Sequence, residues 1–92
     1  MIQSFRDERA RRLLIGERVP GLGVIEEAAR GRLLRLNAAA SVRDLAAIRG
    51  NNLEPLKRDR AGQFSIRIND QFRICFTWEQ KGPSNVEIVD YH

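Results

Sequence analysis

Two segments in the second half of the chain alternate between apolar and polar residues. Apolar side chains occupy every second position from Phe64 to Ile68 and again from Phe72 to Trp78. A period of two residues is typical of a β-strand with one buried face and one polar face. The three residues between the segments, Asn69–Gln71, predict a tight loop, so the two strands are expected to form a hairpin.

The apolar residues also define the register of this hairpin. A slip of one residue would turn the apolar side chains of one strand away from the core. Pairing Ile68 with Phe72 keeps both apolar sets on one face of the sheet. The same pairing places Arg67 directly opposite Arg73 on the other face.

Two interpretations of this arginine pair are open. Like charges directly opposite each other destabilise a sheet, so Arg67 and Arg73 fit a site where both bind one anion, such as a phosphate. Alternatively, the long side chains diverge into solvent or pair with Asp70 and Glu54. Residues 57–73 carry five basic and two acidic side chains, which predicts a positive patch beside the pair.

The first half of the chain predicts helices. Residues 6–15 form a charged helical segment that Gly16 ends, and Ser41–Asp44 has the pattern of a helix N-terminus whose turn reaches Ile48. The clearest helix lies between these segments, because its apolar residues are three and four positions apart and form one stripe. These residues are Leu22, Ile25, Ala29, Leu33 and Leu36.

Helices followed by an antiparallel sheet predict the α+β class, with N-terminal helices packed on a small antiparallel β-sheet. Further strands are expected at residues 2–5, 53–57 and 86–91, and the apolar face of the sheet is expected to lie against the 22–36 stripe. Alternation places Cys75 on the polar face, where it is expected to fill space under a helix or loop. No repeat or linker divides the chain, so we expect a single domain over residues 1–92.

The composition narrows the class of partner. The basic residues are 14 Arg and 2 Lys, and the net charge is +4. Arg binds phosphate through two parallel N–H groups, so a nucleic acid is one expected partner, and an ordinary solvated surface is the other interpretation. Residues 1–14 carry charges where a signal peptide has its apolar region, and no stretch suits a membrane span, so a cytoplasmic location is expected.

The end of the sequence, Asp90-Tyr91-His92, holds the one histidine of the chain. An imidazole titrates near neutral pH and can transfer a proton, and Asp90 is placed to orient it or to change its pKa. An inert terminal tail is the other interpretation of His92. One His and one Cys cannot form a zinc site, and no glycine-rich nucleotide motif is present, so no metal and no cofactor are expected.

Several segments together form a specific pattern. They are Gly50–Asn51, Leu53–Lys57, Asp59–Arg60, Gly62–Phe76 and Val86–His92, with Met1–Phe5 and Leu36–Ala39 in the front half. This pattern resembles the HigB toxins, also called plasmid-maintenance killer proteins, of the RelE/ParE superfamily. The resemblance implies a microbial-ribonuclease (RelE-like) fold and the toxin of a type II toxin–antitoxin system. It also implies metal-independent cleavage of translated mRNA on the ribosome, inhibition of protein synthesis, and neutralisation by a HigA-type helix-turn-helix antitoxin. Contact with operator DNA is implied only through the toxin–antitoxin complex.

The resemblance also implies the site residues. Arg73, with Arg67 or Lys57, would stabilise charge on the phosphate, and His92 would transfer a proton. The implied catalytic set is Lys57, Arg73, Asp90, Tyr91 and His92. The expected phosphate-binding set is Arg60 and Arg67, which lie in matching motifs, together with Arg58 of the basic run before the hairpin. Asp90 would orient His92 or act as the base, and Tyr91 would stack on a base or position the phosphate.

Three positions depart from the family pattern. Glu54 stands where some HigB toxins have a histidine, Arg58 replaces a frequent Gly, and Phe72 replaces a frequent Trp. Two other functions remain open, because fold alone does not determine activity. One is a non-enzymatic toxin like ParE that binds gyrase, and the other is an RNA-binding module without catalysis. The Arg67–Arg73 pair and His92 favour the nuclease.

Overall fold

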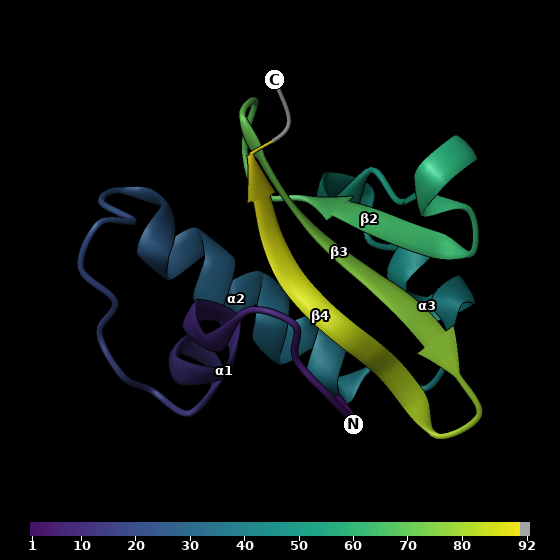
Figure 1. The fold of residues 1–92 in the computed structure, drawn as a ribbon, viewed down its shortest axis with the longest axis horizontal. Helices are drawn as coiled ribbons and strands as arrows, with labels where there is room; N and C mark the ends of the chain where they lie inside the picture. Colours follow the sequence, from purple (N-terminus) through teal and green to yellow (C-terminus); the bar gives the residue numbers. More distant parts are fainter. Residues whose placement is uncertain (91–92) are drawn as a thin grey trace.

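The computed structural model describes residues 1–90 and has an α+β fold, as the sequence predicted (Figure 1). Its four strands form one antiparallel sheet in the order β1–β2–β3–β4, so each strand pairs with its neighbours in sequence. In chain order the elements are α1 (Glu8–Leu14), α2 (Ile25–Ala38), α3 (Val42–Ala46), the 3₁₀-helix η1 (Arg49–Asn51), β1 (Glu54–Pro55), the 3₁₀-helix η2 (Arg58–Arg60), β2 (Gln63–Arg67), β3 (Phe72–Glu79) and β4 (Gly82–Asp90).

The hairpin of β2 and β3 has the register that the sequence predicts. Ile66 pairs with Ile74, and Arg67 pairs with Arg73. Phe64 pairs with Phe76, and their rings stack with centroids 6.0 Å apart. The apolar side chains of both strands therefore share one face of the sheet.

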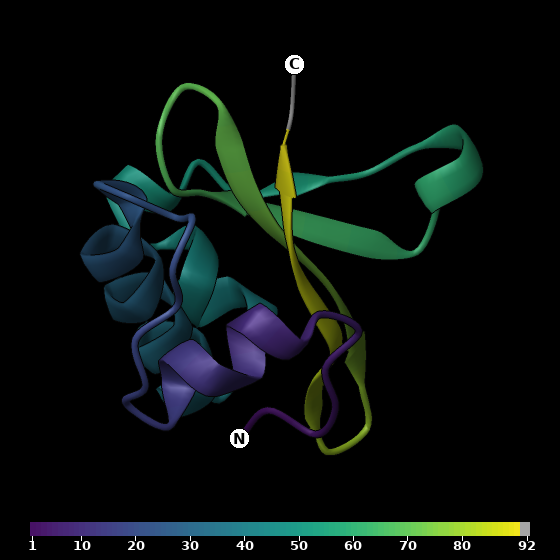
Figure 2. The ribbon, with the colours of Figure 1, turned by 60° about the vertical axis from the view of Figure 1, so that its left-hand side comes forward.

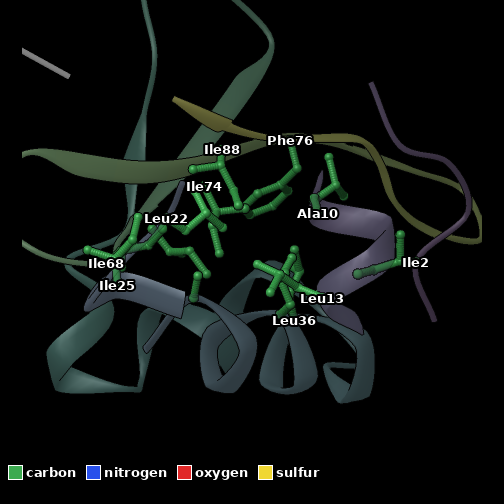
Figure 3. Packing of buried hydrophobic residues seen from close by; sticks show 14 of the residues in the cluster. Ile2, Ala10, Leu13, Leu22, Ile25, Leu36, Ile68, Ile74, Phe76 and Ile88 are labelled. Atoms are coloured by element: carbon green, nitrogen blue, oxygen red, sulfur yellow. The ribbon is translucent and has the colours of Figure 1, made fainter. Parts of the chain in front are cut away.

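Helices α1 and α2 cover this apolar face. Figure 3 shows Ile74, Phe76 and Ile88 of the sheet turned toward the helices, in one cluster with Leu13 of α1 and Leu36 of α2. All five side chains are buried, and α3 adds the fully buried Leu45 to the same cluster. Apolar burial on this scale is the main stabilising contribution in a small domain, at about 25 cal/mol per Å² removed from water.

The 22–36 stripe is buried as expected, but its helix begins at Ile25 and not at Leu22. The reason is local, since Gly21 and Gly23 have φ values of +97° and +58°, which a right-handed helix excludes. Leu22 packs into the core from the turn before the helix and is 8% exposed. Within residues 1–90 no helix combines the length and apolar character needed to cross a membrane.

Helix α3 has the N-terminal cap that the sequence predicts. The Ser41 hydroxyl accepts a hydrogen bond from the backbone N–H of Asp44 (3.2 Å), and the Asp44 carboxylate accepts one from the backbone N–H of Ala40 (3.0 Å). These bonds satisfy N–H groups that a helix N-terminus leaves without intrahelical partners. The helix ends at Ala46, two residues before the predicted Ile48.

The predicted first strand, residues 2–5, is not a regular strand. Only Phe5 forms a bridge, which is parallel, with Val86 of β4. The segment is nevertheless bound to β4, because Gln3 donates to the Pro83 carbonyl (2.8 Å) and Val86 donates to the Ser4 carbonyl (3.1 Å). The segment therefore shields part of the outer edge of the sheet without extending it.

Two strand boundaries also differ from expectation. The strand predicted at 53–57 is reduced to Glu54–Pro55, although Leu56 still donates to the Gln63 carbonyl (2.8 Å). The strand predicted at 86–91 begins earlier, at Gly82, and continues to Asp90. The register shifts between Cys75 and Thr77, a shift that accompanies the left-handed Asn85 on β4 (φ +55°). Position 91 of the prediction lies outside the described residues.

Asp7 joins α1 to β4. Its carboxylate accepts hydrogen bonds from the backbone N–H groups of Arg9 (2.9 Å) and Ile88 (3.1 Å), and it pairs with the Arg9 guanidinium (3.0 Å). Burial alone would raise the pKa of Asp7, but the hydrogen bonds from Arg9 and Ile88 outweigh burial, so the pKa lies below its ordinary value of 3.8. Asp7 therefore stabilises the fold in its charged form.

We expect Asp7→Ala to lower the free energy of unfolding at neutral pH by about 1–2 kcal/mol, because the helix cap and the bond to Ile88 are lost. Since the folded-state pKa is depressed, the contribution of Asp7 is present above about pH 4 and is lost as the pH falls through the folded pKa. Urea unfolding at about pH 7 and pH 3 measures this. Glu8→Ala, on the exposed side of α1, is the control and should change little. An equal Asp7→Ala effect at both pH values would contradict the assignment.

Candidate functional site

The polar face of the sheet is the face opposite α1 and α2. It comprises Ser65 and Arg67 of β2, Arg73 and Cys75 of β3, and Glu87 of β4. Antiparallel partners project to the same side, so the pairs Ser65–Cys75, Arg67–Arg73 and Cys75–Glu87 bring these side chains together. The polar face is not uniformly solvated, because Ser65 and Cys75 are fully buried.

Arg73 lies at the hairpin-loop end of the polar face and is held by two different elements. Its Nε donates to the Ser65 hydroxyl (2.7 Å), and its Nη2 donates to the backbone carbonyl of Asn52 (2.5 Å). Asn52 follows η1 and has a left-handed backbone (φ +43°). The guanidinium of Arg73 therefore has a defined orientation, and its side chain is half-buried instead of extending freely into solvent.

The Arg67 side chain points toward the hairpin loop, away from Ser65. Its guanidinium pairs with Asp70 in the hairpin loop, as one of the two sequence interpretations proposed, while Arg73 reaches back toward Ser65. Its backbone carbonyl accepts a hydrogen bond from Nε of Arg32 on α2 (3.0 Å). The Asp70 side chain is 99% exposed, so this ion pair contributes little to stability. The two arginines share a register position without directing their charges at each other.

Asp90 lies at the same end of the sheet. It pairs in register with Phe72, next to the Arg73–Val89 pair, and its carboxylate accepts a hydrogen bond from the Gln71 side chain (3.1 Å). The predicted site residues Tyr91 and His92 follow directly in sequence and lie outside the described residues.

Arg60, Lys57 and Arg58 lie toward the opposite end of β2. Arg60 donates to the Gln63 side chain (3.0 Å) and pairs with Glu87 (3.2 Å), so its charge is balanced within the fold. Lys57 and Arg58 are exposed at the start of η2. Figure 2 shows this part of the chain projecting away from α1 and α2. The sequence-predicted residues thus form two groups, at the two ends of one strand.

Cys75 lies between these groups and is buried, as expected for a residue that fills space. Burial raises the pKa of its thiol, the charges of Arg60 and Arg73 oppose that effect, and Glu87 adds to it. A thiol with a raised pKa stays protonated at neutral pH and is a poor nucleophile. The geometry therefore gives Cys75 a packing role.

Three residues of this region were not predicted from the sequence, namely Asn52, Ser65 and Glu87. Ser65 was visible in the alternation pattern as a neighbour of Arg67 on the polar face. Glu87 could be placed only once the register of β4 was known. Asn52 takes part through its backbone carbonyl, which no pattern of side chains reveals.

Two hollows of the described surface, of about 280 Å³ and 250 Å³, lie away from the polar face, one beside Arg18, Glu26 and Arg30 and one beside Glu79 and Lys81. Among residues 1–90 no three His, Cys, Asp or Glu side chains are grouped so that they could hold a metal ion. A row of polar and basic side chains along one face of a sheet suits an extended, polymeric anion.

Comparison with known proteins identifies the family. The sequence model for the RelE-like toxin of the type II toxin–antitoxin system HigB matches residues 3–92. The chain belongs to the HigB-like toxin family. One relative of this toxin is Toxin HigB-1 from Vibrio cholerae serotype O1 (strain ATCC 39315 / El Tor Inaba N16961), which is 34% identical over 76 residues. The aligned region covers 83% of this chain and 73% of that protein.

Membership of the HigB-like family makes the protein a toxin of a type II toxin–antitoxin system, and its partner is therefore an antitoxin. The fold gives a physical reason for the glycine that is frequent in the family at position 58. Arg58 has φ +57°, in the left-handed region where glycine is favoured and a side chain is strained. The frequent family glycine suits this conformation, and Arg58 adopts it at an energetic cost.

We expect Arg58→Gly to raise the free energy of unfolding by about 0.5–1 kcal/mol, because glycine adopts this φ without the steric penalty. Chemical denaturation of the two proteins measures the difference. Arg43→Gly is the matched control, since Arg43 lies inside α3 and its replacement should be destabilising. A loss of stability in Arg58→Gly comparable to that of the control would contradict the strain at Arg58.

Proposed function

We propose that this HigB-like toxin is an endoribonuclease that cleaves mRNA during translation on the ribosome, acting as one RelE-like domain over residues 1–92. The observation that carries the proposal is the way Ser65 and Asn52 hold Arg73 on the polar face. A guanidinium held in advance by Ser65 and Asn52 is suited to stabilise charge that grows on a phosphoryl group. Arg67, at the same register position, supplies a second guanidinium at that end of the sheet.

The proposed reaction uses the RNA's own 2′-hydroxyl as nucleophile and needs no metal. A base removes the 2′-OH proton, the oxygen attacks the adjacent phosphorus, and the P–O5′ bond breaks. The products are a 2′,3′-cyclic phosphate and a 5′-OH, whose oxygen receives a proton from a general acid. Arg73 stabilises the charge on the non-bridging oxygens, because its N–H groups are fixed before the substrate arrives.

Proton transfer is assigned to the end of the chain. His92 is the proposed proton-transfer group, with Asp90 orienting it or acting as base, and Tyr91 stacks on a base or positions the phosphate. The support for this assignment is that Asp90 directly precedes Tyr91 and His92 in the sequence; its ladder partner is Phe72, whose side chain alternates to the face opposite Arg73. Lys57 is proposed to contact the phosphate as well.

At the opposite end of β2, Arg58 and Arg60 are proposed to bind the RNA backbone. The Arg60–Glu87 pair makes Arg60 the weaker candidate, since its charge is already balanced. Glu54 pairs in register with Ser65 at the edge of the sheet. A catalytic role of Glu54 is therefore a separate question, which mutation of Glu54 tests.

The distribution of charge supports ribosome binding. Residues 28–53 carry five Arg and one Asp, whereas residues 1–27 and 54–92 each have equal numbers of basic and acidic side chains. The whole net charge of +4 therefore resides in residues 28–53, which span most of α2 together with α3 and η1. Arg35, Arg43 and Arg49 are exposed there and form no ion pair within residues 1–90. A surface of this kind fits the phosphate backbone of ribosomal RNA.

The antitoxin is proposed to be of the HigA type, with a helix-turn-helix domain. Contact with operator DNA is then made through the toxin–antitoxin complex. Translated mRNA and ribosomes place the site of action in the cytoplasm, with no membrane involved.

The proposal is tested by Arg73→Ala in a translation reaction. We expect mRNA cleavage, followed by primer extension, to fall by roughly 10²–10³-fold, because one preorganised donor to the developing charge is removed. The variant should also lose about 1–2 kcal/mol of stability, since the buried Ser65 hydroxyl loses its partner. Circular dichroism at the assay temperature establishes that the variant is folded. Arg11→Ala is the control, because it removes the same charge from the exposed surface of α1 and should cleave normally.

A folded Arg73→Ala protein with full activity would remove Arg73 from the site. If the wild-type protein stops growth but leaves translated mRNA intact, and DNA supercoiling by gyrase is lost, the ParE-like function is correct instead. If it binds RNA and neither effect occurs, the protein is an RNA-binding module.

The charged surface of α2, α3 and η1 gives a separate prediction. Replacing Arg35, Arg43 and Arg49 with Gln should weaken ribosome binding and reduce the slope of log Kd against log salt concentration by about 2–3. Co-sedimentation with ribosomes at several salt concentrations measures both quantities. The same replacement of Arg9, Arg11 and Arg12, which pair with carboxylates of their own region, is the control. Equal effects of the two triple variants would show that only total charge matters.

A further inference from the structure

Asn51 is a buried polar residue beside the site to which the proposed function gives no role. It is the last residue of η1 and is fully buried. Its Nδ2 donates to the backbone carbonyl of Leu45, near the end of α3 (3.1 Å). Its Oδ1 is also buried and has no hydrogen-bond partner in the described part of the chain. The side chain is therefore only half satisfied.

Packing alone does not explain this choice of residue. A buried polar atom without a partner is destabilising, and an apolar side chain of similar shape at the same place is often neutral or stabilising. Such exceptions in native proteins often occur where geometry matters more than stability. The bond from Asn51 to Leu45 fixes how η1 is joined to α3, and this junction determines the path of the next residue.

The next residue, Asn52, is the one that holds Arg73. Asn52 has φ +43°, a left-handed conformation that Asn tolerates better than most residues. In this conformation its carbonyl accepts the hydrogen bond from Arg73 Nη2 (2.5 Å). The direction of that carbonyl depends on the backbone turn and not on the exposed Asn52 side chain.

Two anchors on separate elements therefore define the plane of the Arg73 guanidinium. Ser65 binds Nε from β2, and Asn52 binds Nη2 from the turn after η1. If the turn shifts while Ser65 stays in place, the guanidinium rotates about its bond to Ser65. A small misplacement of a group that stabilises a transition state is costly, since a shift of about 1 Å can reduce a rate by roughly 100-fold.

We propose that Asn51 and Asn52 are positioning residues for Arg73, with the buried Asn51 amide fixing the left-handed turn whose carbonyl aligns the guanidinium. This inference rests on the proposed ribonuclease function and names the part of the fold that aligns its principal cation. It predicts that changes at residues 51 and 52 alter the rate of cleavage and not the affinity for the ribosome.

The first test is Asn51→Leu, which keeps the size of the side chain and removes both polar atoms. The unfolding midpoint in urea should stay the same or rise, because the unpartnered Oδ1 is removed. The single-turnover rate of cleavage on translated mRNA should fall by roughly 10- to 100-fold, with unchanged ribosome affinity. Asn37→Leu is the control, because Asn37 accepts a hydrogen bond from the Ile2 backbone at another part of the fold (2.8 Å). It should lose stability and keep its rate.

A second pair of variants tests the turn without touching the core. Asn52→Gly keeps the carbonyl and adopts positive φ freely, so its rate should stay within a few-fold of the wild type. Asn52→Val disfavours positive φ, so its rate should fall as in Asn51→Leu. Since the Asn52 side chain is exposed, neither variant removes a buried contact.

A double-mutant cycle with Arg73→Ala separates positioning from general structural damage. If Asn51 acts through Arg73, Asn51→Leu has no further effect on the rate in the Arg73→Ala background. The positioning role would be overturned if Asn51→Leu lowered the cleavage rate as much in the Arg73→Ala background as in the wild type. It would also be overturned by a normal rate in both Asn51→Leu and Asn52→Val. If the wild-type protein itself does not cleave translated mRNA, the ribonuclease function fails, and this result is distinct from a cleaving wild type with unaffected variants.

Discussion

The register of β2 against β3 is the constraint on which the other features depend. Ile66 and Ile74 face each other and are fully buried against the helices, so a slip of one residue would expose an entire row of apolar side chains. The cost of that slip, at about 25 cal/mol per Å² of apolar surface, locks the pairing. The same register places Arg67 beside Arg73 on the opposite face. The hydrophobic core thus determines where the basic side chains are presented.

The molecule separates its positive charge into two regions with different surroundings. On the polar face, Arg67 is paired with a carboxylate and Arg73 is oriented by Ser65 and Asn52, and Arg60 of η2 pairs with Glu87 of this face. The net charge of the chain instead lies in residues 28–53. In the proposed function the first region performs the chemistry and the second provides salt-dependent attraction to RNA, so the two effects respond to different mutations.

The hairpin and its register followed from the alternation of residues 64–78, because period and apolar pairing are encoded locally. The start of β4 could not be predicted in this way. Residues Gly82–Asn85 have the composition of a turn, and they pair only because β3 lies beside them. Within the site, Arg67 and Arg73 were placed correctly, whereas the anchor at Asn52 is a backbone carbonyl set by tertiary structure. That these residues act on RNA stays a prediction, as do the roles of Tyr91 and His92.

The most direct test compares cleavage of one mRNA in the presence and absence of translating ribosomes, with the ends of the products identified chemically. We predict cuts only when the message is translated, with 2′,3′-cyclic phosphate and 5′-OH ends. Equally fast cleavage of the free message would contradict ribosome dependence. Product ends with a 5′-phosphate would contradict attack by the 2′-hydroxyl, and an intact message beside arrested growth would contradict a ribonuclease altogether.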